Sequence, residues 1–240
     1  LLAAMAVPCT PPIDQPRAQK RLDLTLLGPA KLDRIVESPR QIIRGRTPGT
    51  LKVRLYADDA VPPAESPAPD PAVSSNDLAA TLYIQSDHPL IRRQAESITG
   101  GRTSAWEKAV ALHDWVYKNV DKKPTISLPS ALDVLKQRQG DCNEHTYLFV
   151  ALARAAGLPA RVRVGIVYQN GAFYYHAWPA VFVDRWREMD PTFGQLAVDA
   201  THLALLDGEL ADQMQLLGTI GRLQIQVDSA APPPGGPPRD

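Results

Sequence analysis

The most restrictive feature of this sequence is an apolar run that directly follows the hexapeptide Gly-Asp-Cys-Asn-Glu-His at residues 140–145. From Thr146 to Ala156 nearly every position is apolar, so a helix here would carry apolar side chains on almost all of its faces. Gly157 and Pro159 then provide a stop signal. The sequence therefore predicts a helix that begins near Cys142 and is buried in the core of a domain.

Cys142 lies in the first turn of this predicted helix. The unpaired N–H groups of a first turn stabilise negative charge, which favours a thiolate and lowers the pKa of a cysteine placed there. Cys142 is therefore a candidate nucleophile. A small apolar residue at a buried helix start would explain the same position equally well, and this stretch alone leaves both interpretations open.

Length, charge and cysteine count limit the classes of protein to consider. The 240 residues suffice for one good-sized domain with extensions. Lys plus Arg and Asp plus Glu both number 26, and no phosphate-binding loop is present, so nucleic acid is not an expected partner. Cys9 and Cys142 are too few for a disulfide framework, and we expect both to be free. No apolar run reaches the ~18 residues that would span a bilayer.

The first seven residues, Leu-Leu-Ala-Ala-Met-Ala-Val, resemble the end of a signal hydrophobic region, although neither an initiator methionine nor a basic leader precedes them. The remnant of a secretory segment and the edge of a truncated domain explain them equally well. The sequence therefore leaves the compartment, cytoplasmic or extracytoplasmic, open.

Clusters of proline mark the expected domain boundaries, because the 23 prolines gather at both ends and in one internal segment. The expected parts are a proline-rich N-terminal segment (1–20), extended or poorly ordered; a short β unit (21–60); a proline-rich linker (61–76); the main domain (77–228); and a disordered tail (229–240).

Hydrophobic periodicity and capping residues predict the secondary structure within these parts. The expected elements are strands at 22–27, 41–46 and 51–56, helices at 89–99, 104–120, 130–140 and 142–156, strands at 161–168, 173–183 and 186–192, a helix at 202–217 and a strand at 222–227. Ser104 with Glu107, and Ser130 with Asp133, match the capping-box pattern. His113 falls on an apolar helix stripe, where a hydrogen-bonded core histidine is expected.

A cysteine nucleophile needs a base within reach and a third group that orients the base. His176 in Tyr-Tyr-His-Ala-Trp and Asp190 in Met-Asp-Pro-Thr are the candidates. Asn170-Gly171 predicts a two-residue hairpin turn that would place His176 opposite Gly165. We expect the missing side chain of Gly165 to leave room for a substrate or for the imidazole.

The next hairpin decides whether the two candidates can meet. A two-residue turn before Trp186 would place Asp190 and His176 on opposite faces of the sheet. A three-residue loop over 183–185 instead pairs Phe182 with Trp186 and leaves Asp190 diagonal to His176 on one face. A bulge at the proline of the central strand would shift the parity equally. A catalytic triad therefore requires one of these two irregularities.

These segments together resemble the bacterial transglutaminase-like domain, a papain-related α+β family that uses a cysteine, a histidine and an aspartate. The resemblance covers roughly residues 77–227 and rests on Gly-Asp-Cys-Asn-Glu-His, Leu-Pro-Ala-Arg-Val, Tyr-His-Ala-Trp and Asp-Pro-Thr in the family's order. It implies a buried nucleophile helix packed on an antiparallel β meander. It makes Cys142 the nucleophile, His176 the general base and then acid, and Asp190 the orienting carboxylate.

The resemblance implies acyl transfer on peptide or protein amide bonds through a thioester, without a cofactor. Water as acceptor, which makes a peptidase or amidase, is favoured over an amine, which makes a crosslinking enzyme. The alternative is a non-catalytic binding or scaffold module with the same fold. Loss of a triad residue would be the sign of such a module, and none is lost.

Three further groups of residues carry weaker expectations. Cys142, His145, His176 and Asp190 also form a plausible four-ligand zinc set, although no metal is expected. Crosslinking members of the family stabilise the oxyanion with an upstream tryptophan, but the upstream tryptophans here, Trp106 and Trp115, lie on a predicted helix, which leaves the second oxyanion donor unassigned. The segment Asp-Ala-Thr-His at 199–202 also resembles the family, without a role that can be attached to it.

Overall fold

The computed structural model describes residues 6–28, 35–61, 73–123, 130–209, 212–213 and 220–231. Its chain divides into two compact units. The first unit comprises Leu1–Asp58, Val164–His176 and Val198–Asp240, and the second comprises Asp59–Arg163 and Ala177–Ala197. Residues 164–176 and 198–228, which the sequence analysis assigned to the main domain, belong to the first unit in this division.

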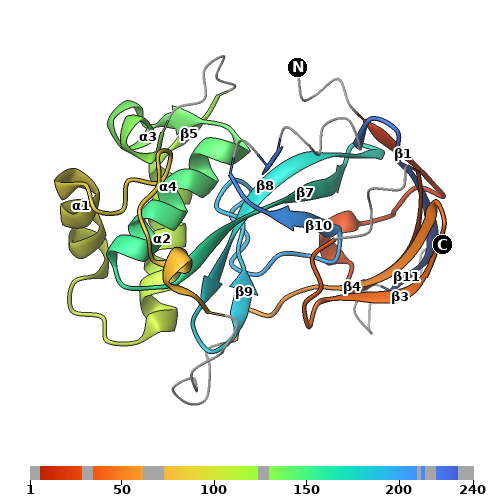
Figure 1. Cartoon of the computed structure of the whole chain (residues 1–240), viewed down its shortest axis with the longest axis horizontal. Helices are drawn as coiled ribbons and strands as arrows, with labels where there is room; N and C mark the ends of the chain where they lie inside the picture. Colours follow the sequence, from red (N-terminus) through yellow and green to blue (C-terminus); the bar gives the residue numbers. More distant parts are fainter. Residues whose placement is uncertain are drawn as a thin grey trace. The chain divides into compact units, whose positions relative to one another are not determined.

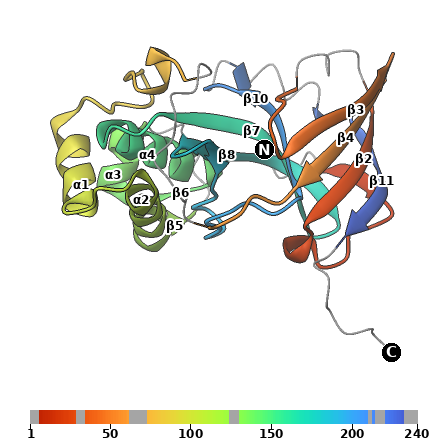
Figure 2. The ribbon, with the colours of Figure 1, turned by 90° about the horizontal axis from the view of Figure 1, so that it is seen from below.

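The first unit is built on a twisted sheet with the strand order β10-β7-β8-β1-β11-β2-β4-β3. The strands are β1 (Val7–Thr10), β2 (Arg21–Leu27), β3 (Gln41–Thr47), β4 (Thr50–Tyr56), β7 (Ala160–Gln169), β8 (Ala172–Phe182), β10 (His202–Asp207) and β11 (Gln224–Ala231). Figure 2 shows β3, β4, β2 and β11 side by side. The strands predicted at 22–27, 41–46, 51–56 and 222–227 are thus confirmed, with small shifts of their ends.

Alternating leucines explain why β2 and β4 pair as they do. Leu22, Leu24 and Leu26 are fully buried. They lie opposite Leu55, Val53 and Leu51 in an antiparallel ladder. Because side chains alternate between the two faces of a strand, this register places all six on the same face, where they form the core of the first unit.

Within the N-terminal segment, β1 pairs in parallel with β11 and antiparallel with β8, and Pro16–Ala18 form a short 3-10 helix, so only part of the segment is extended. Residues 229–231 of the predicted disordered tail belong to β11, so the prediction is wrong for them. Residues 1–5, most of the linker (62–72) and the end of the tail (232–240) lie outside the described residues.

The helix predicted at 202–217 is wrong over 202–207, which form β10; residues 210–211 and 214–219 lie outside the described part. A short apolar run does not distinguish a buried strand from a buried helix. The deciding contact comes from β7, where a Cβ on Gly165 would lie 2.0 Å from the Leu203 carbonyl oxygen. Gly165 therefore admits the backbone of β10, and the expectation that it leaves room for a substrate or an imidazole is wrong.

The second unit contains four helices, α1 (Pro89–Thr99), α2 (Ala105–Asn119), α3 (Ala131–Gln137) and α4 (Cys142–Ala155). α4 packs against the other three, as Figure 1 shows. Its residues from Asn143 to Ala153 are all buried, which confirms the predicted core helix. The unit also contains the short parallel pair β5 (Asp121–Lys122) and β6 (Gln139–Gly140), and β9 (Trp186–Glu188).

Two of the predicted helix starts behave differently. The capping box of Ser130 and Asp133 is present at the start of α3. Ser104 is the N-cap of α2, but its side chain makes no capping hydrogen bond, so that predicted capping box is wrong. α3 ends at Gln137 rather than near Gly140, because Arg138 takes a left-handed conformation with φ 56°.

Both hairpins agree with the predicted turns. Asn170 and Gly171 have φ values of 50° and 93°, as a tight two-residue turn requires. β9 pairs with β8 so that Phe182 lies opposite Trp186, which confirms the three-residue loop. β9 is shorter than the predicted strand 186–192, because Asp190 leaves the ladder and forms an isolated bridge with Gln195. The predicted α+β class is confirmed.

None of the described helices is long and apolar enough to cross a membrane.

Candidate active site

The start of α4 holds Cys142 through a capping box that the sequence analysis did not predict. Asp141 is the N-cap, and its side chain accepts a hydrogen bond from the Asn143 N–H at 3.1 Å. The Glu144 carboxylate accepts one from the Asp141 N–H at 2.8 Å. A Cβ on Gly140 would lie 2.2 Å from the Glu144 Cβ, so only glycine fits there. The local sequence thereby places the thiol in the first helical turn.

The Cys142 thiol lies against β8. The backbone N–H of Ala177 donates a hydrogen bond to its sulfur. Ala177 follows His176 in the chain, so a single peptide bond joins the residue that contacts the sulfur to the predicted base. Covalent geometry therefore brings the backbone of His176 to the nucleophile.

The electrostatics of the thiol differ from the expectation for a helix start. Burial raises the pKa of Cys142 well above its usual value, and the Asp141, Glu144 and Asp190 carboxylates act in the same direction. The Ala177 N–H lowers this pKa but does not outweigh them. The predicted lowering of the Cys142 pKa is therefore wrong for the resting protein. These groups disfavour the thiolate, so its formation calls for a base that accepts the proton.

Glu144 contributes a titratable group beside the thiol. Its side chain is buried, and burial, followed by the hydrogen bond and the charge of Asp141, raises its pKa to about 7. The negative charge at the first turn of α4 therefore changes near neutral pH.

Asp190 is fully buried and held by its own turn. Its Oδ1 accepts hydrogen bonds from the N–H groups of Thr192 at 2.7 Å and Phe193 at 3.0 Å. Its backbone N–H and C=O pair with those of Gln195. One carboxylate oxygen is therefore committed to the turn, which fixes the direction of the other.

α2 supports this turn from its buried face. Nε2 of His113 lies 3.3 Å from the Asp190 carbonyl oxygen, and its Nδ1 lies 3.0 Å from Oδ1 of Asp114. A Cβ on Gly194 would lie 2.7 Å from the ring of Tyr117, so the turn packs directly on α2. His113 is thus the buried, hydrogen-bonded core histidine that its position predicts, and it also contacts the Asp190 segment.

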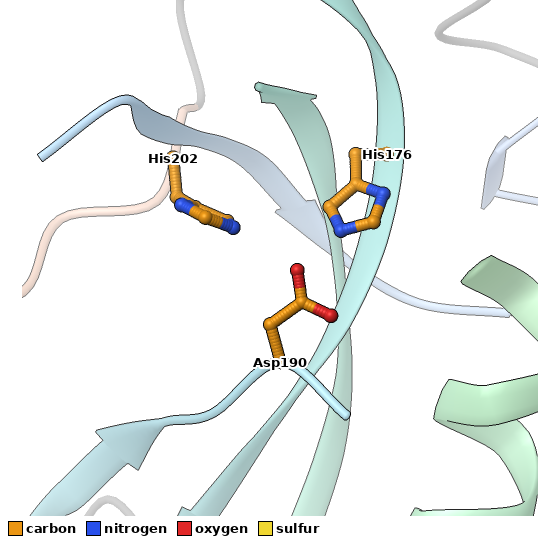
Figure 3. Close-up of side chains that lie close together, drawn as sticks. All are labelled: His176, Asp190 and His202. Carbon is orange, nitrogen blue, oxygen red and sulfur yellow. The ribbon is translucent and has the colours of Figure 1, made fainter. Parts of the chain in front are cut away.

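His176 is buried on β8, and the ring of His202 on β10 packs against it. Figure 3 labels both histidines. His202 and its neighbour Asp199 are the residues to which the sequence analysis attached no role. The only sequence signal for them was the family-like Asp-Ala-Thr-His pattern, because their contacts depend on the pairing of β10.

The zinc set that included His145 does not form. Nδ1 of His145 lies 2.7 Å from the Asp141 carbonyl oxygen, and Nε2 lies 3.2 Å from that of Val120. Both ring nitrogens thus face backbone carbonyls, and burial lowers the pKa of this histidine. His145 joins the start of α4 to the end of α2 and leaves no nitrogen for a metal.

Neither upstream tryptophan is placed like the family's oxyanion donor. Arg187 lies over the ring of Trp106, 5.1 Å from its centroid, and Arg138 lies over that of Trp115 at 4.3 Å. Both tryptophans therefore act in cation–π contacts on α2.

Residues 92–191 match the model of the transglutaminase-like superfamily. An uncharacterized protein of Haemophilus influenzae is 34% identical over 110 residues, an alignment that covers 40% of this chain and 30% of that protein. The chain thus spans less than a third of this relative.

Two solved structures are similar to this chain. A presumed cysteine protease from Cytophaga hutchinsonii has a TM-score of 0.58 and 18% identity over 90% of this chain and 84% of that one. The periplasmic domain of TgpA from Pseudomonas aeruginosa has a TM-score of 0.47 and 18% identity over 75% of this chain and 67% of that one. Because its identity is only 18%, the Cytophaga hutchinsonii structure supports the fold of this chain and not its activity.

Proposed function

We propose that this chain, whose residues 92–191 match the model of the transglutaminase-like superfamily, is an acyl-transfer enzyme with Cys142 as the nucleophile. In this proposal His176 acts as general base and then acid, and Asp190 orients its imidazole. The observation that carries the proposal is the hydrogen bond from the Ala177 N–H to the sulfur, since it fixes the thiol beside the residue that follows His176.

The raised pKa of Cys142 defines the first step of the proposed reaction. The thiol proton passes to His176, and the sulfur attacks the carbonyl carbon of a peptide or protein amide. The N–H of Cys142 itself, at the first turn of α4, is the proposed donor to the oxyanion. His176 then gives its proton to the departing amine, which leaves a thioester on Cys142.

Water is the proposed acceptor of the acyl group. His176 removes a proton from water, the hydroxide attacks the thioester, and the carboxylic acid leaves while the thiol is restored. Transfer to an amine would instead need a pocket that excludes water and holds the amine. The protein is therefore proposed to be a peptidase or amidase.

A non-catalytic binding module is the second candidate. The pKa of Cys142, raised by burial and by three carboxylates, favours it, because a thiol held in its neutral form is a poor nucleophile.

The deciding experiment measures iodoacetamide alkylation of Cys142 against pH, in a Cys9→Ser background that leaves one thiol. We expect His176→Ala to slow alkylation at neutral pH at least tenfold and to move the profile to higher pH, because the thiol loses its proton acceptor. Identical profiles in both proteins would favour the binding module. Peptide cleavage assayed with and without an added primary amine then separates hydrolysis from amine incorporation.

A further inference from the structure

Asp199 and His202 are buried members of a chain of charged and polar groups in the first unit, which begins at the exposed Arg17. Oδ2 of Asp199 accepts a hydrogen bond from Nη1 of Arg17 at 2.7 Å. Its Oδ1 accepts one from the Thr201 N–H at 2.8 Å and lies 3.4 Å from Nδ1 of His202. Asp199 is 5% exposed and His202 is completely buried. Arg17 and the Thr201 amide thus anchor the carboxylate, and the carboxylate faces the histidine.

The backbone of the same segment is held as firmly as its side chains. The guanidinium of Arg40, itself buried, donates hydrogen bonds to the carbonyl oxygens of Asp199 at 3.2 Å and His202 at 2.9 Å. On the other side, Gly165 lets the backbone of β10 approach β7 closely. Burying these charges costs folding free energy unless each is paired, and the arrangement holds the backbone that carries His202 by several independent contacts.

The fixed His202 ring packs against His176. The ring centroids are 5.8 Å apart with an interplanar angle of 62°, so the contact is edge-to-face (Figure 3). The χ2 torsion of a histidine side chain is broad and roughly two-fold. An imidazole with no neighbouring group packed against it therefore samples two opposite orientations. The His202 ring is such a neighbouring group for His176.

We propose that His202, anchored by Asp199 and Arg17, is a positioning residue that holds the His176 imidazole in its reactive orientation. The inference rests on the proposed function of His176. In the flipped orientation each ring nitrogen exchanges places with a ring carbon, Nδ1 with Cδ2 and Nε2 with Cε1, and a base misplaced by about 1 Å can cost on the order of 100-fold in rate. The Asp-Ala-Thr-His segment thereby receives a role, as the support of the base.

The test uses the full chain in the Cys9→Ser background, with His202→Leu and His202→Phe as a matched pair. Leucine removes the ring, and phenylalanine keeps it. We expect His202→Leu to lower Cys142 alkylation at neutral pH, and kcat for peptide cleavage, at least tenfold with KM unchanged. His202→Phe should recover the rate to within about threefold of the parent. Equal rates in a folded His202→Leu protein and its parent would overturn the proposal.

A second readout observes His176 directly. Its side-chain resonances in a ¹⁵N,¹³C-histidine spectrum, assigned by their loss in His176→Asn, should shift or split in Asp199→Asn, a nearly isosteric change that also serves if His202→Leu does not fold. Unchanged His176 resonances in Asp199→Asn would overturn the proposal. His88→Asn is the control, because His88 is an exposed helix cap and its loss should leave the His176 resonances in place.

The two proposals fail in different ways. If His176→Ala leaves Cys142 alkylation unchanged, the proposed function is wrong, whatever the resonances show. If His176→Ala slows alkylation but the His202 and Asp199 variants change neither rates nor resonances, only the positioning role is wrong.

Discussion

The second unit contains two buried groups of charges that are built in opposite ways. In the first, Nη1 of Arg163 lies 2.5 Å from Oε1 of Glu188, and the Trp178 indole N–H donates to Oε2 of the same carboxylate at 2.7 Å. Both charged side chains are less than 5% exposed. The carboxylate is paired with a cation and hydrogen-bonded at both oxygens. These contacts offset the free-energy cost of burying the charges, and the group joins β7, β8 and β9.

The second group surrounds Cys142 at the start of α4. The charges that shift the pKa of its thiol are the carboxylates of Asp141, Glu144 and Asp190, and all three raise it. A paired carboxylate stabilises the strands that carry it, whereas gathered carboxylates beside a buried thiol oppose ionisation. The Arg163 group therefore serves stability, whereas the carboxylates around Cys142 act on the ionisation of its thiol. Four predictions test this contrast.

The largest effect is expected at the nucleophile. Cys142→Ser should lower peptide cleavage on the order of 1,000-fold or more, because a hydroxyl is a far weaker nucleophile than a thiolate. The free energy of unfolding in urea should change little. Cys9→Ser, which alters the other free thiol, is the matched control and should retain activity. Parental activity in Cys142→Ser would exclude covalent catalysis at this residue.

Glu188→Ala should destabilise the protein by about 3–5 kcal/mol, because it leaves the Arg163 guanidinium buried without its partner. Urea unfolding of parent and variant measures the difference. Asp121→Ala removes the exposed partner of Lys123 and should cost less than about 1 kcal/mol. Similar losses in the two variants would contradict the structural role assigned to the Arg163 group.

Glu144 links the site to pH. Its pKa rises from 4.5 in the unfolded chain to about 7 in the folded protein, so the folded protein binds the extra proton. The contribution of Glu144 to the free energy of unfolding is fully present below pH 4.5 and is lost as the pH rises through about 7. Glu144→Gln keeps a capping oxygen but does not titrate. Relative to this variant, the free energy of unfolding of the parent should fall by about 3 kcal/mol at most as the pH rises over this range.

Urea midpoints at pH 4.5 and 8 measure this difference between parent and Glu144→Gln. The variant should also alkylate Cys142 at a lower pH than the parent, because one carboxylate near the sulfur is gone. A pH dependence of stability that is the same in both proteins would show that Glu144 does not titrate in this range.

The smallest effect is expected from two substitutions at helix N-caps, Ser130→Ala and Ser104→Ala. Ser130→Ala should destabilise the protein by about 1 kcal/mol, because it removes the capping box of α3. Ser104→Ala is its matched control and should cost a few tenths of a kcal/mol or less, since the Ser104 side chain makes no capping hydrogen bond. Thermal or urea unfolding separates the two, and equal losses would contradict the assigned caps.

Local sequence predicted much of the fold because its signals act over short distances. The apolar run after Cys142 predicted the buried α4, Asn170-Gly171 predicted the hairpin turn, and alternating leucines predicted β2 and β4. The three-residue loop before Trp186 followed from the requirement that His176 and Asp190 share one face, and the observed register agrees. Capping was harder to predict, since Ser104 matches the pattern without making the bond.

The sequence by itself determined the central helix, the β8 hairpins and the candidate residues Cys142, His176 and Asp190, because each depends on neighbours within a few positions. Tertiary structure alone decided that residues 202–207 form a strand, since their conformation depends on the distant Gly165. It also decided the direction in which the pKa of Cys142 is shifted. A helix start favours the thiolate, but burial, the neighbouring carboxylates of Asp141 and Glu144, and the distant carboxylate of Asp190 together raise this pKa. Burial and the position of Asp190 depend on the packed chain, and no local pattern records them.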